Sequence, residues 1–175
     1  MKNLLTAVCV GIALVGVSYA QTVTKAELDG ARSSKPRIAV LEFNDTTGTM
    51  TYEAKRQLQA SIAFELVKNR DFDVPDVRNT RAATQAGGTA VSIGKKLGVE
   101  YVLTGTVTEY STTTGRMTVR TQLTKVGTGT LILPGNTSAQ STAPMTANAG
   151  HPEMSAKVVK PLIQKLMASF KAADL

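Results

Sequence analysis

The chain has 175 residues, a formal net charge of +7, one cysteine and one histidine. A single histidine, His151, rules out a histidine triad or a His-rich metal site within one subunit. The basic residues are scattered rather than gathered in a tract, so they indicate a general attraction to anionic surfaces and not nucleic-acid binding. We expect no metal and no cofactor.

The first twenty residues have the pattern of a cleavable signal peptide. Lys2 supplies the positive start, Leu4 to Val17 is almost unbroken apolar sequence, and Ser18-Tyr19-Ala20 places small residues before a cut ahead of Gln21. The apolar run is short for a hydrocarbon core of ~30 Å. The only cysteine, Cys9, lies in the middle of that run, so a lipoprotein is not expected. A cysteine-free exported protein of this size fits the bacterial periplasm.

Residues 21–36 lack sustained periodicity and are predicted to be a flexible tail, followed by one domain over residues 37–175. Arg37 to Phe43 is a compact apolar run that ends in Asn44 to Gly48, which predicts a buried strand and its exit loop. No long composition shift divides the rest of the chain.

A helical period replaces the strand pattern between Thr51 and Asn69. Four apolar residues recur every four positions and two more join them: Ala54, Leu58, Ile62 and Leu66, with Phe64 and Val67. We interpret the segment as an amphipathic helix packed on a sheet. Phe72 to Val77 then predicts a short strand, at an edge or ending at Pro75, so that strand, helix and strand form a parallel, right-handed unit.

Two short helices are predicted next. The first runs from a cap at Asn79 or Thr80 to Gln85, and the second runs from Thr89 to Leu97 and stops before Gly98. The stretch around the second helix faintly matches a phosphate-binding loop, but its glycines are one residue too far apart. A glycine-capped helix with two solvent-exposed lysines is the better interpretation.

The second half of the chain predicts an antiparallel meander. Glu100 to Tyr110 is the strongest strand signal and is placed centrally, with Gly105 marking a bend or a close backbone approach. After a turn at Ser111 to Gly115, apolar and polar residues alternate in a half-buried strand that includes Met117, Val119, Thr121 and Leu123. A hairpin at Gly127 to Gly129 leads into Thr130 to Leu133.

Pro134 and Gly135 are predicted to end that last strand. Residues 136–152 are rich in Ser, Thr, Ala, Asn, Gly and Pro and are predicted to be a mobile loop or irregular edge, which contains His151. A terminal amphipathic helix follows, which Pro161 either kinks or starts in its longer part. The predicted fold class is α/β: a mixed sheet, parallel at its start and antiparallel afterwards, packed by helices.

Three segments resemble the CsgG family of curli secretion proteins: residues 36–48, the stretch from Lys96 to Tyr110, and the turn at Val126 to Gly129. The same α/β shape recurs in LpoB, an outer-membrane activator of penicillin-binding proteins, and in the amino-terminal domain of TolB. The resemblance implies a CsgG-like or TolB-N-like fold and a non-enzymatic assembly or interaction module at the bacterial outer membrane, in curli-type secretion or envelope biogenesis. It also implies an envelope protein as partner and leaves homo-oligomer formation and peripheral contact with the outer membrane or cell wall open.

Two departures from the family separate the alternatives. The chain lacks the lipid-anchor cysteine, and the first place for a membrane hairpin, Ser111 to Gly115, is short against the ~9–11 residues of a membrane strand. Both favour a soluble periplasmic relative over a pore-forming secretion subunit. A regulator of a peptidoglycan synthase stays open as the alternative function.

Candidate site residues are few. Arg116 and Arg120 share one strand face with Thr118 and Gln122, which predicts a basic stripe for an acidic partner or an anionic polymer; a solvated sheet face is the alternative. A hydrolase built on Glu42 and Asp45 is a hypothesis of another class. Acids in such turn-rich surroundings favour turns and caps instead, as do those between Asp71 and Asp76.

Overall fold

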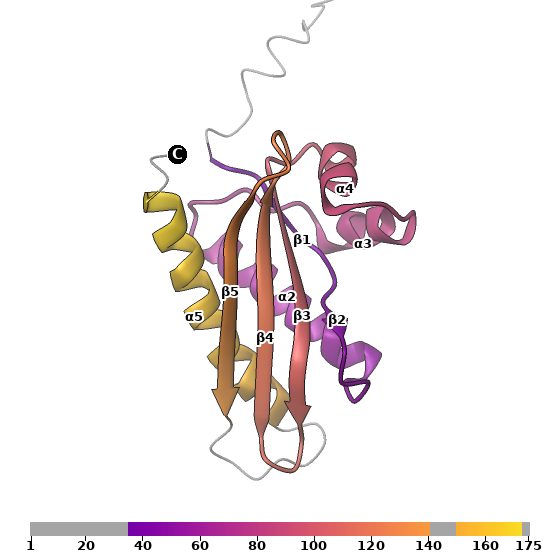
Figure 1. Cartoon of the computed structure of the whole chain (residues 1–175), viewed down its shortest axis with the longest axis vertical. Helices are drawn as coiled ribbons and strands as arrows, with labels where there is room; N and C mark the ends of the chain where they lie inside the picture. Colours follow the sequence, from indigo (N-terminus) through magenta and orange to yellow (C-terminus); the bar gives the residue numbers. More distant parts are fainter. Residues whose placement is uncertain (1–34, 141–149, 173–175) are drawn as a thin grey trace, which may run out of the picture. The chain divides into compact units, whose positions relative to one another are not determined.

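The computed structural model of the protein describes residues 35–140 and 150–172. The predicted signal peptide, nearly all of the predicted tail and the middle of the predicted loop before the last helix lie outside the described residues. The elements follow one another in this order along the chain (Figure 1): β1 (Ile38–Val40), β2 (Asn44–Asp45), α2 (Tyr52–Lys68), α3 (Val77–Gln85), α4 (Ala90–Leu97), β3 (Tyr101–Ser111), β4 (Arg116–Lys125), β5 (Leu131–Gln140) and α5 (Gly150–Ala172).

The strands form one mixed sheet, which confirms the predicted fold class. Its order is β1-β3-β4-β5, with β2 also paired to β3. β1 and β2 run parallel to β3, whereas β3 with β4 and β4 with β5 are antiparallel. β3 therefore lies between the parallel strands and the meander, at the central place predicted for it.

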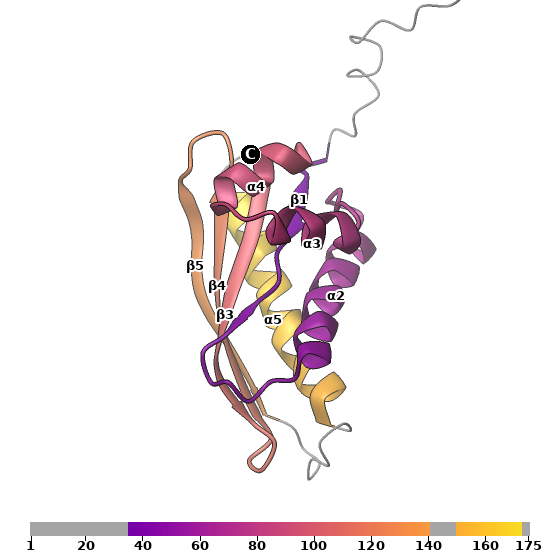
Figure 2. The ribbon, with the colours of Figure 1, turned by 90° about the vertical axis from the view of Figure 1, so that its right-hand side faces the viewer.

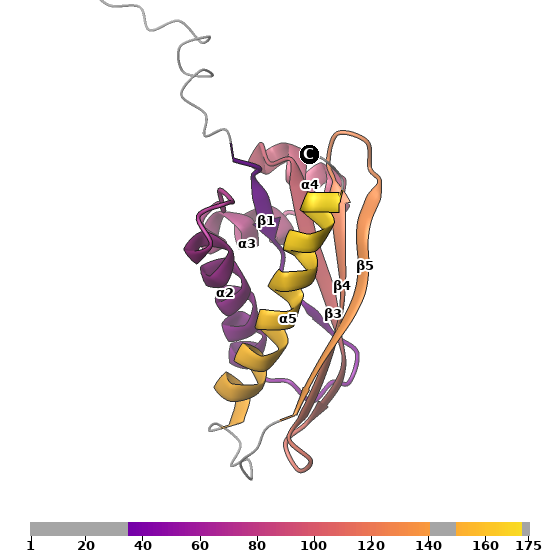
Figure 3. The ribbon, with the colours of Figure 1, turned by 90° about the vertical axis from the view of Figure 1, so that its left-hand side faces the viewer.

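The two faces of the sheet are covered differently. One face carries the main core, in which Leu103 and Met117 of the sheet pack with α2 and α5, and both helices lie on that side of the sheet (Figures 2 and 3). On the other face Ala39 and Val102 form a smaller cluster with Ile93 of α4. Because successive side chains of a strand point to opposite faces, the buried runs of β1 and β3 can serve both clusters.

Helix α2 is confirmed, but its exposed residues differ from the prediction. The Thr51 hydroxyl accepts a hydrogen bond from the Ala54 amide at 3.2 Å. Phe64 and Val67 do not join the buried stripe, because their side chains are 66% and 53% exposed. Phe64 follows the buried Ile62 by two residues, which turns it about 200° around the helix axis, away from the sheet.

The region after α2 also differs from the prediction. Instead of a strand over Phe72 to Val77, only Asp73 forms an isolated parallel bridge, with Arg37. Asp76, and not Asn79 or Thr80, caps α3 by accepting the Arg78 amide at 2.7 Å. Pro75 has no N–H for a ladder, and a strong capping carboxylate directly after it starts a helix.

The predicted first strand is split in two. β1 ends at Val40, and the chain pairs with β3 again at Asn44–Asp45, a segment predicted to be loop. Between these two pairings Phe43 is 1% exposed and packs against Gly105 of β3. A Cβ atom on Gly105 would overlap the Phe43 ring, which confirms the predicted close approach at this glycine.

The last strand and helix are longer than predicted. β5 continues through Pro134 and Gly135 to Gln140, so the first residues of the predicted loop are strand. β5 is an edge strand of the sheet. Proline is tolerated in an edge strand, because one side of that strand forms no hydrogen bonds with a neighbouring strand. α5 begins at Gly150, which places His151 in its first turn rather than in a loop, and it runs through Pro161.

Candidate interaction surfaces

Arg116 and Arg120 lie where the alternation predicted them, on the outward face of β4. Both are exposed, and they are four strand residues apart, which corresponds to about 13 Å. In the register of β3 with β4, Arg116 lies opposite Ser111 and Arg120 lies opposite Thr106. The two arginines therefore lie on the same face of the sheet, but they are too far apart to form one compact cluster.

An acidic residue that the sequence did not predict lies beside Arg116. A register shift between Val107 and Glu109 brings Glu109 opposite Thr118, whose hydroxyl donates to the Glu109 carboxylate at 2.9 Å. Arg116 Nη1 lies 3.9 Å from Glu109 Oε1, and with Ser138 and Gln140 of β5 these side chains line a polar hollow of about 380 Å³. The stripe is consequently of mixed charge at one end. Binding of a partner by Arg116 and Arg120 stays a prediction.

The second surface is an apolar groove between α2 and α5, here called the α2–α5 groove. It has a volume of about 440 Å³. The described residues that line it come from the two helices: Gln57, Ala60, Ser61, Phe64, Glu65, Pro152, Ser155, Ala156, Val159 and Lys160. The α2 residues are spaced by three or four positions, so they occupy one face of that helix.

Small side chains account for the space in the groove. Ala60 and Ser61 on α2 and Ala156 on α5 leave room between the helices, and the exposed ring of Phe64 stands beside it. Tyr52 is also 56% exposed, but the Arg56 guanidinium lies 5.5 Å from the centre of its ring. Phe64 lines this groove, whereas Tyr52 does not.

The described residues in the walls of the groove include one charge of each sign. Glu65 belongs to α2, and its carboxylate lies 3.8 Å from the ammonium group of Lys68 on the same helix. Lys160 is exposed on α5. An exposed ion pair spaced three residues apart on a helix contributes little, so Glu65 can exchange its partner at small cost.

Of the two acidic residues of the hydrolase hypothesis, Glu42 is half-buried and Asp45 holds a turn. The Asp45 carboxylate accepts hydrogen bonds from the Thr47 amide, from the Thr47 hydroxyl and from the Met50 amide, at 2.9, 2.6 and 2.9 Å. Burial raises the pKa of Asp45, but these hydrogen bonds to its charged form outweigh that effect, so its pKa lies below its usual range. This arrangement agrees with the turn interpretation of Asp45.

The lowered pKa of Asp45 gives a pH prediction. A carboxyl with a lower pKa in the folded state than in the unfolded chain stabilises the fold fully above the unfolded pKa of about 4, and this contribution disappears as the pH falls through the folded pKa. We expect Asp45→Asn to be less stable than the natural protein at pH 7, with a difference that shrinks below about pH 4. Urea unfolding at several pH values measures this, and a difference that stays constant with pH contradicts it.

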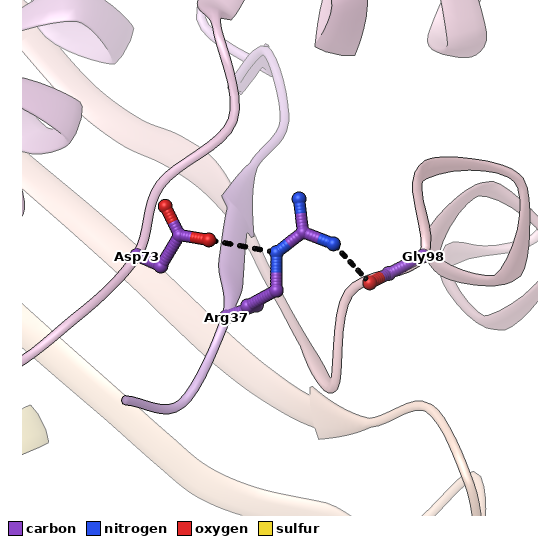
Figure 4. A network of polar contacts seen from close by, with 3 residues as sticks. All are labelled: Arg37, Asp73 and Gly98. Atoms are coloured by element: carbon purple, nitrogen blue, oxygen red, sulfur yellow. Dashed lines mark hydrogen bonds and ion pairs between the residues drawn. The ribbon is translucent and has the colours of Figure 1, made fainter. Parts of the chain in front are cut away.

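Asp73 has a structural partner as well (Figure 4). Arg37 Nε lies 2.8 Å from Asp73 Oδ2, and Arg37 Nη1 donates to the Gly98 carbonyl oxygen at 2.7 Å. One guanidinium thus joins the start of β1 to the loop after α2 and to the end of α4. These contacts account for Asp73 without a catalytic role.

The segment that faintly matches a phosphate loop is a capped helix. The Thr89 hydroxyl accepts from the Ser92 amide at 3.2 Å, and Gly98 ends α4 in the left-handed conformation with φ of 62°. Lys95 and Lys96 are both exposed, as the capped-helix interpretation predicts. Within residues 35–140 and 150–172, no three His, Cys, Asp or Glu residues gather as metal ligands would. No helix in these ranges combines the length and apolarity of a membrane span.

The mixed α/β fold is similar to that of the C-terminal domain of LpoB. The C-terminal domain of LpoB from Escherichia coli matches with a TM-score of 0.50 and 21% identity, over 66% of this chain and 91% of that one. Lipoprotein GNA1162 from Neisseria meningitidis matches at 0.51 and 20% identity, over 74% and 98%. The PelC dodecamer from Paraburkholderia phytofirmans matches at 0.52 and 15% identity, over 75% and 88%.

These similarities concern the fold. No family model matches the chain, and no curated protein does. The fold relationship to LpoB that the sequence implied is supported, whereas membership of the CsgG family stays a prediction.

Proposed function

We propose that the chain is a non-enzymatic interaction module of the bacterial envelope, exported by residues 1–20 and working in the periplasm as residues 21–175. The observation that carries the proposal is the α2–α5 groove with Phe64 on its wall. A large aromatic side chain beside an apolar hollow is a typical anchor of a protein interface.

The energetics favour a covered groove. Complete burial of a phenylalanine side chain stabilises by about 1.5–3 kcal/mol, and Phe64 is 66% exposed in the isolated chain. Covering the ring would therefore contribute roughly 1–2 kcal/mol to a complex. Grooves between two helices receive amphipathic helices or single apolar side chains in many complexes.

The fold relatives support an envelope role. One is described as a lipoprotein and another as a dodecamer. In this chain the only cysteine belongs to the proposed signal peptide, so we propose a soluble periplasmic protein that docks to an envelope protein. In its finer role, we propose, it acts at the outer membrane as a CsgG-like assembly module, in curli-type secretion or envelope biogenesis.

A regulator of a peptidoglycan synthase is the alternative function, and the LpoB-type fold favours it. In either role the Arg116 and Arg120 face provides a second, polar contact. Its mixed charges would contribute more to the orientation of a partner than to the affinity, because exposed ion pairs contribute little to affinity.

Site-specific photocrosslinking in living cells tests the proposal. A photoreactive phenylalanine analogue at Phe64 is expected to give a crosslinked product in the periplasmic fraction. The same analogue at Val67, exposed on α2 but outside the groove lining, is the matched control and should give little product. The same analogue at a third position, Arg120, tests whether the polar face of β4 also contacts a partner. Absence of any product at Phe64, or recovery of the chain in the cytoplasm, contradicts the proposal.

A further inference from the structure

We infer that the occupant of the α2–α5 groove is the same groove of a second copy of this chain, related by a twofold axis. The inference rests on the proposed function as an interaction module and names its partner at this surface. It is argued from the shape of the groove and from the position of its two charges.

The groove surface can complement itself. An interface with twofold symmetry uses the same patch on both subunits, so the patch must contain both a projection and a space to receive it. Phe64 is the projection, and the hollow of about 440 Å³ beside Ala60 and Ala156 is the space. Each copy would then bury its own Phe64 against the partner's α5.

The charges are placed to match across such an axis. Glu65 lies on the α2 wall and Lys160 on the α5 wall. When two copies meet groove to groove with α2 facing α5, Glu65 of each copy meets Lys160 of the other, and the pair forms twice. Among the described lining residues, neither charge is left facing a like charge.

The same charges disfavour an acidic partner in the groove. The whole chain carries +7, but the described residues that line the groove include one acidic and one basic residue and are neutral together. These residues offer an acidic segment no net positive charge. A neutral, self-matching groove instead selects a copy of itself.

Charge exchange provides the test, using protein purified from the periplasm and analytical ultracentrifugation. The natural protein is expected to dimerise with rising concentration, and Glu65→Lys or Lys160→Glu alone is expected to weaken dimerisation at least about tenfold. Mixing the two variants should restore the dimer, because the lysine introduced on α2 of one variant then faces the glutamate introduced on α5 of the other. The natural pair of Lys160 and Glu65 still forms once in this mixed dimer. Phe64→Ala should weaken dimerisation by a similar factor.

Lys95→Glu is the matched control, because it makes the same charge change as Lys160→Glu on an exposed residue of α4, outside the groove lining. It should leave the dimer intact, and thermal unfolding of every variant checks that it folds. A natural protein that is monomeric at all concentrations, that forms larger rings, or whose mixed variants do not pair overturns the inference.

The crosslinking result separates the two proposals. A product of twice the chain mass at Phe64 supports self-association. A product with a different protein, together with a monomer in ultracentrifugation, removes the self-association and leaves the proposed function standing. No product at Phe64 removes both.

Discussion

Replacement of Gly105 by alanine is expected to lower the free energy of unfolding by about 1–3 kcal/mol. A Cβ at this position would overlap the ring of Phe43, which is 1% exposed and fills the space between the two short parallel pairings of the sheet. The ring cannot move without disturbing the neighbouring core. Urea unfolding monitored by circular dichroism measures the loss.

Two further variants make this result specific. Gly127→Ala is the matched control, since a Cβ there meets no atom within 4 Å, and it should change stability little. Combining Gly105→Ala with Phe43→Leu should recover part of the loss, because a smaller side chain leaves room for the added methyl group. Equal losses for the two glycine variants, or purely additive losses in the double variant, would show that the Phe43 contact is not the cause.

Replacement of Pro161 by alanine is expected to raise the free energy of unfolding by about 1–3 kcal/mol. Pro161 lies inside α5, where it has no N–H to donate to the Lys157 carbonyl and where its ring crowds that carbonyl. Alanine restores the donor and has the highest helix propensity. Thermal and urea unfolding measure the gain.

Pro152→Ala is the control for this prediction. Pro152 is the third residue of the same helix, where backbone N–H groups have no partner within the helix and proline is tolerated. Its replacement should give little or no gain. If both variants stabilise equally, or if Pro161→Ala destabilises, then Pro161 is favoured by its packing and the helix-interior argument is wrong.

Several features that depend on neighbouring residues could be predicted from the sequence, although the Asp76 cap of α3 was missed. The caps at Thr51, Thr89 and Gly98 act within three or four residues of their partners, so their chemistry alone marks the ends of α2 and α4. The alternation along β4 is equally local, and it placed Arg116 and Arg120 on the exposed face.

Features that depend on residues distant in the chain could not be predicted from the sequence. The pairing of Asn44 with Thr106 joins segments far apart in the chain, and Asn and Asp have low strand propensity. The continuation of β5 past Pro134 depends on its place at the end of the sheet. The buried side of α2 was predicted only in part. Gln59 is 0% exposed and donates to the Val40 carbonyl at 2.8 Å, whereas Phe64 faces outward. Residue polarity alone predicts the opposite for both.

The groove itself needs the tertiary structure. It is formed by α2 near the start of the described chain and α5 at its end, and neither helix has a hollow of its own. A sequence signal exists in Phe64, an aromatic residue opposite the buried stripe. That signal becomes meaningful only when the second helix is known to lie beside it.

The proline in β5 limits how copies of this protein can meet. A terminal strand of regular backbone is a template for further strands, and sheets that grow in this way lead to aggregates. Pro134 lacks a hydrogen-bond donor in the middle of that template, and the glycine after it weakens the strand further. Growth of the sheet across subunits through β5 is thereby disfavoured, so copies that meet at this edge must do so through side-chain contacts.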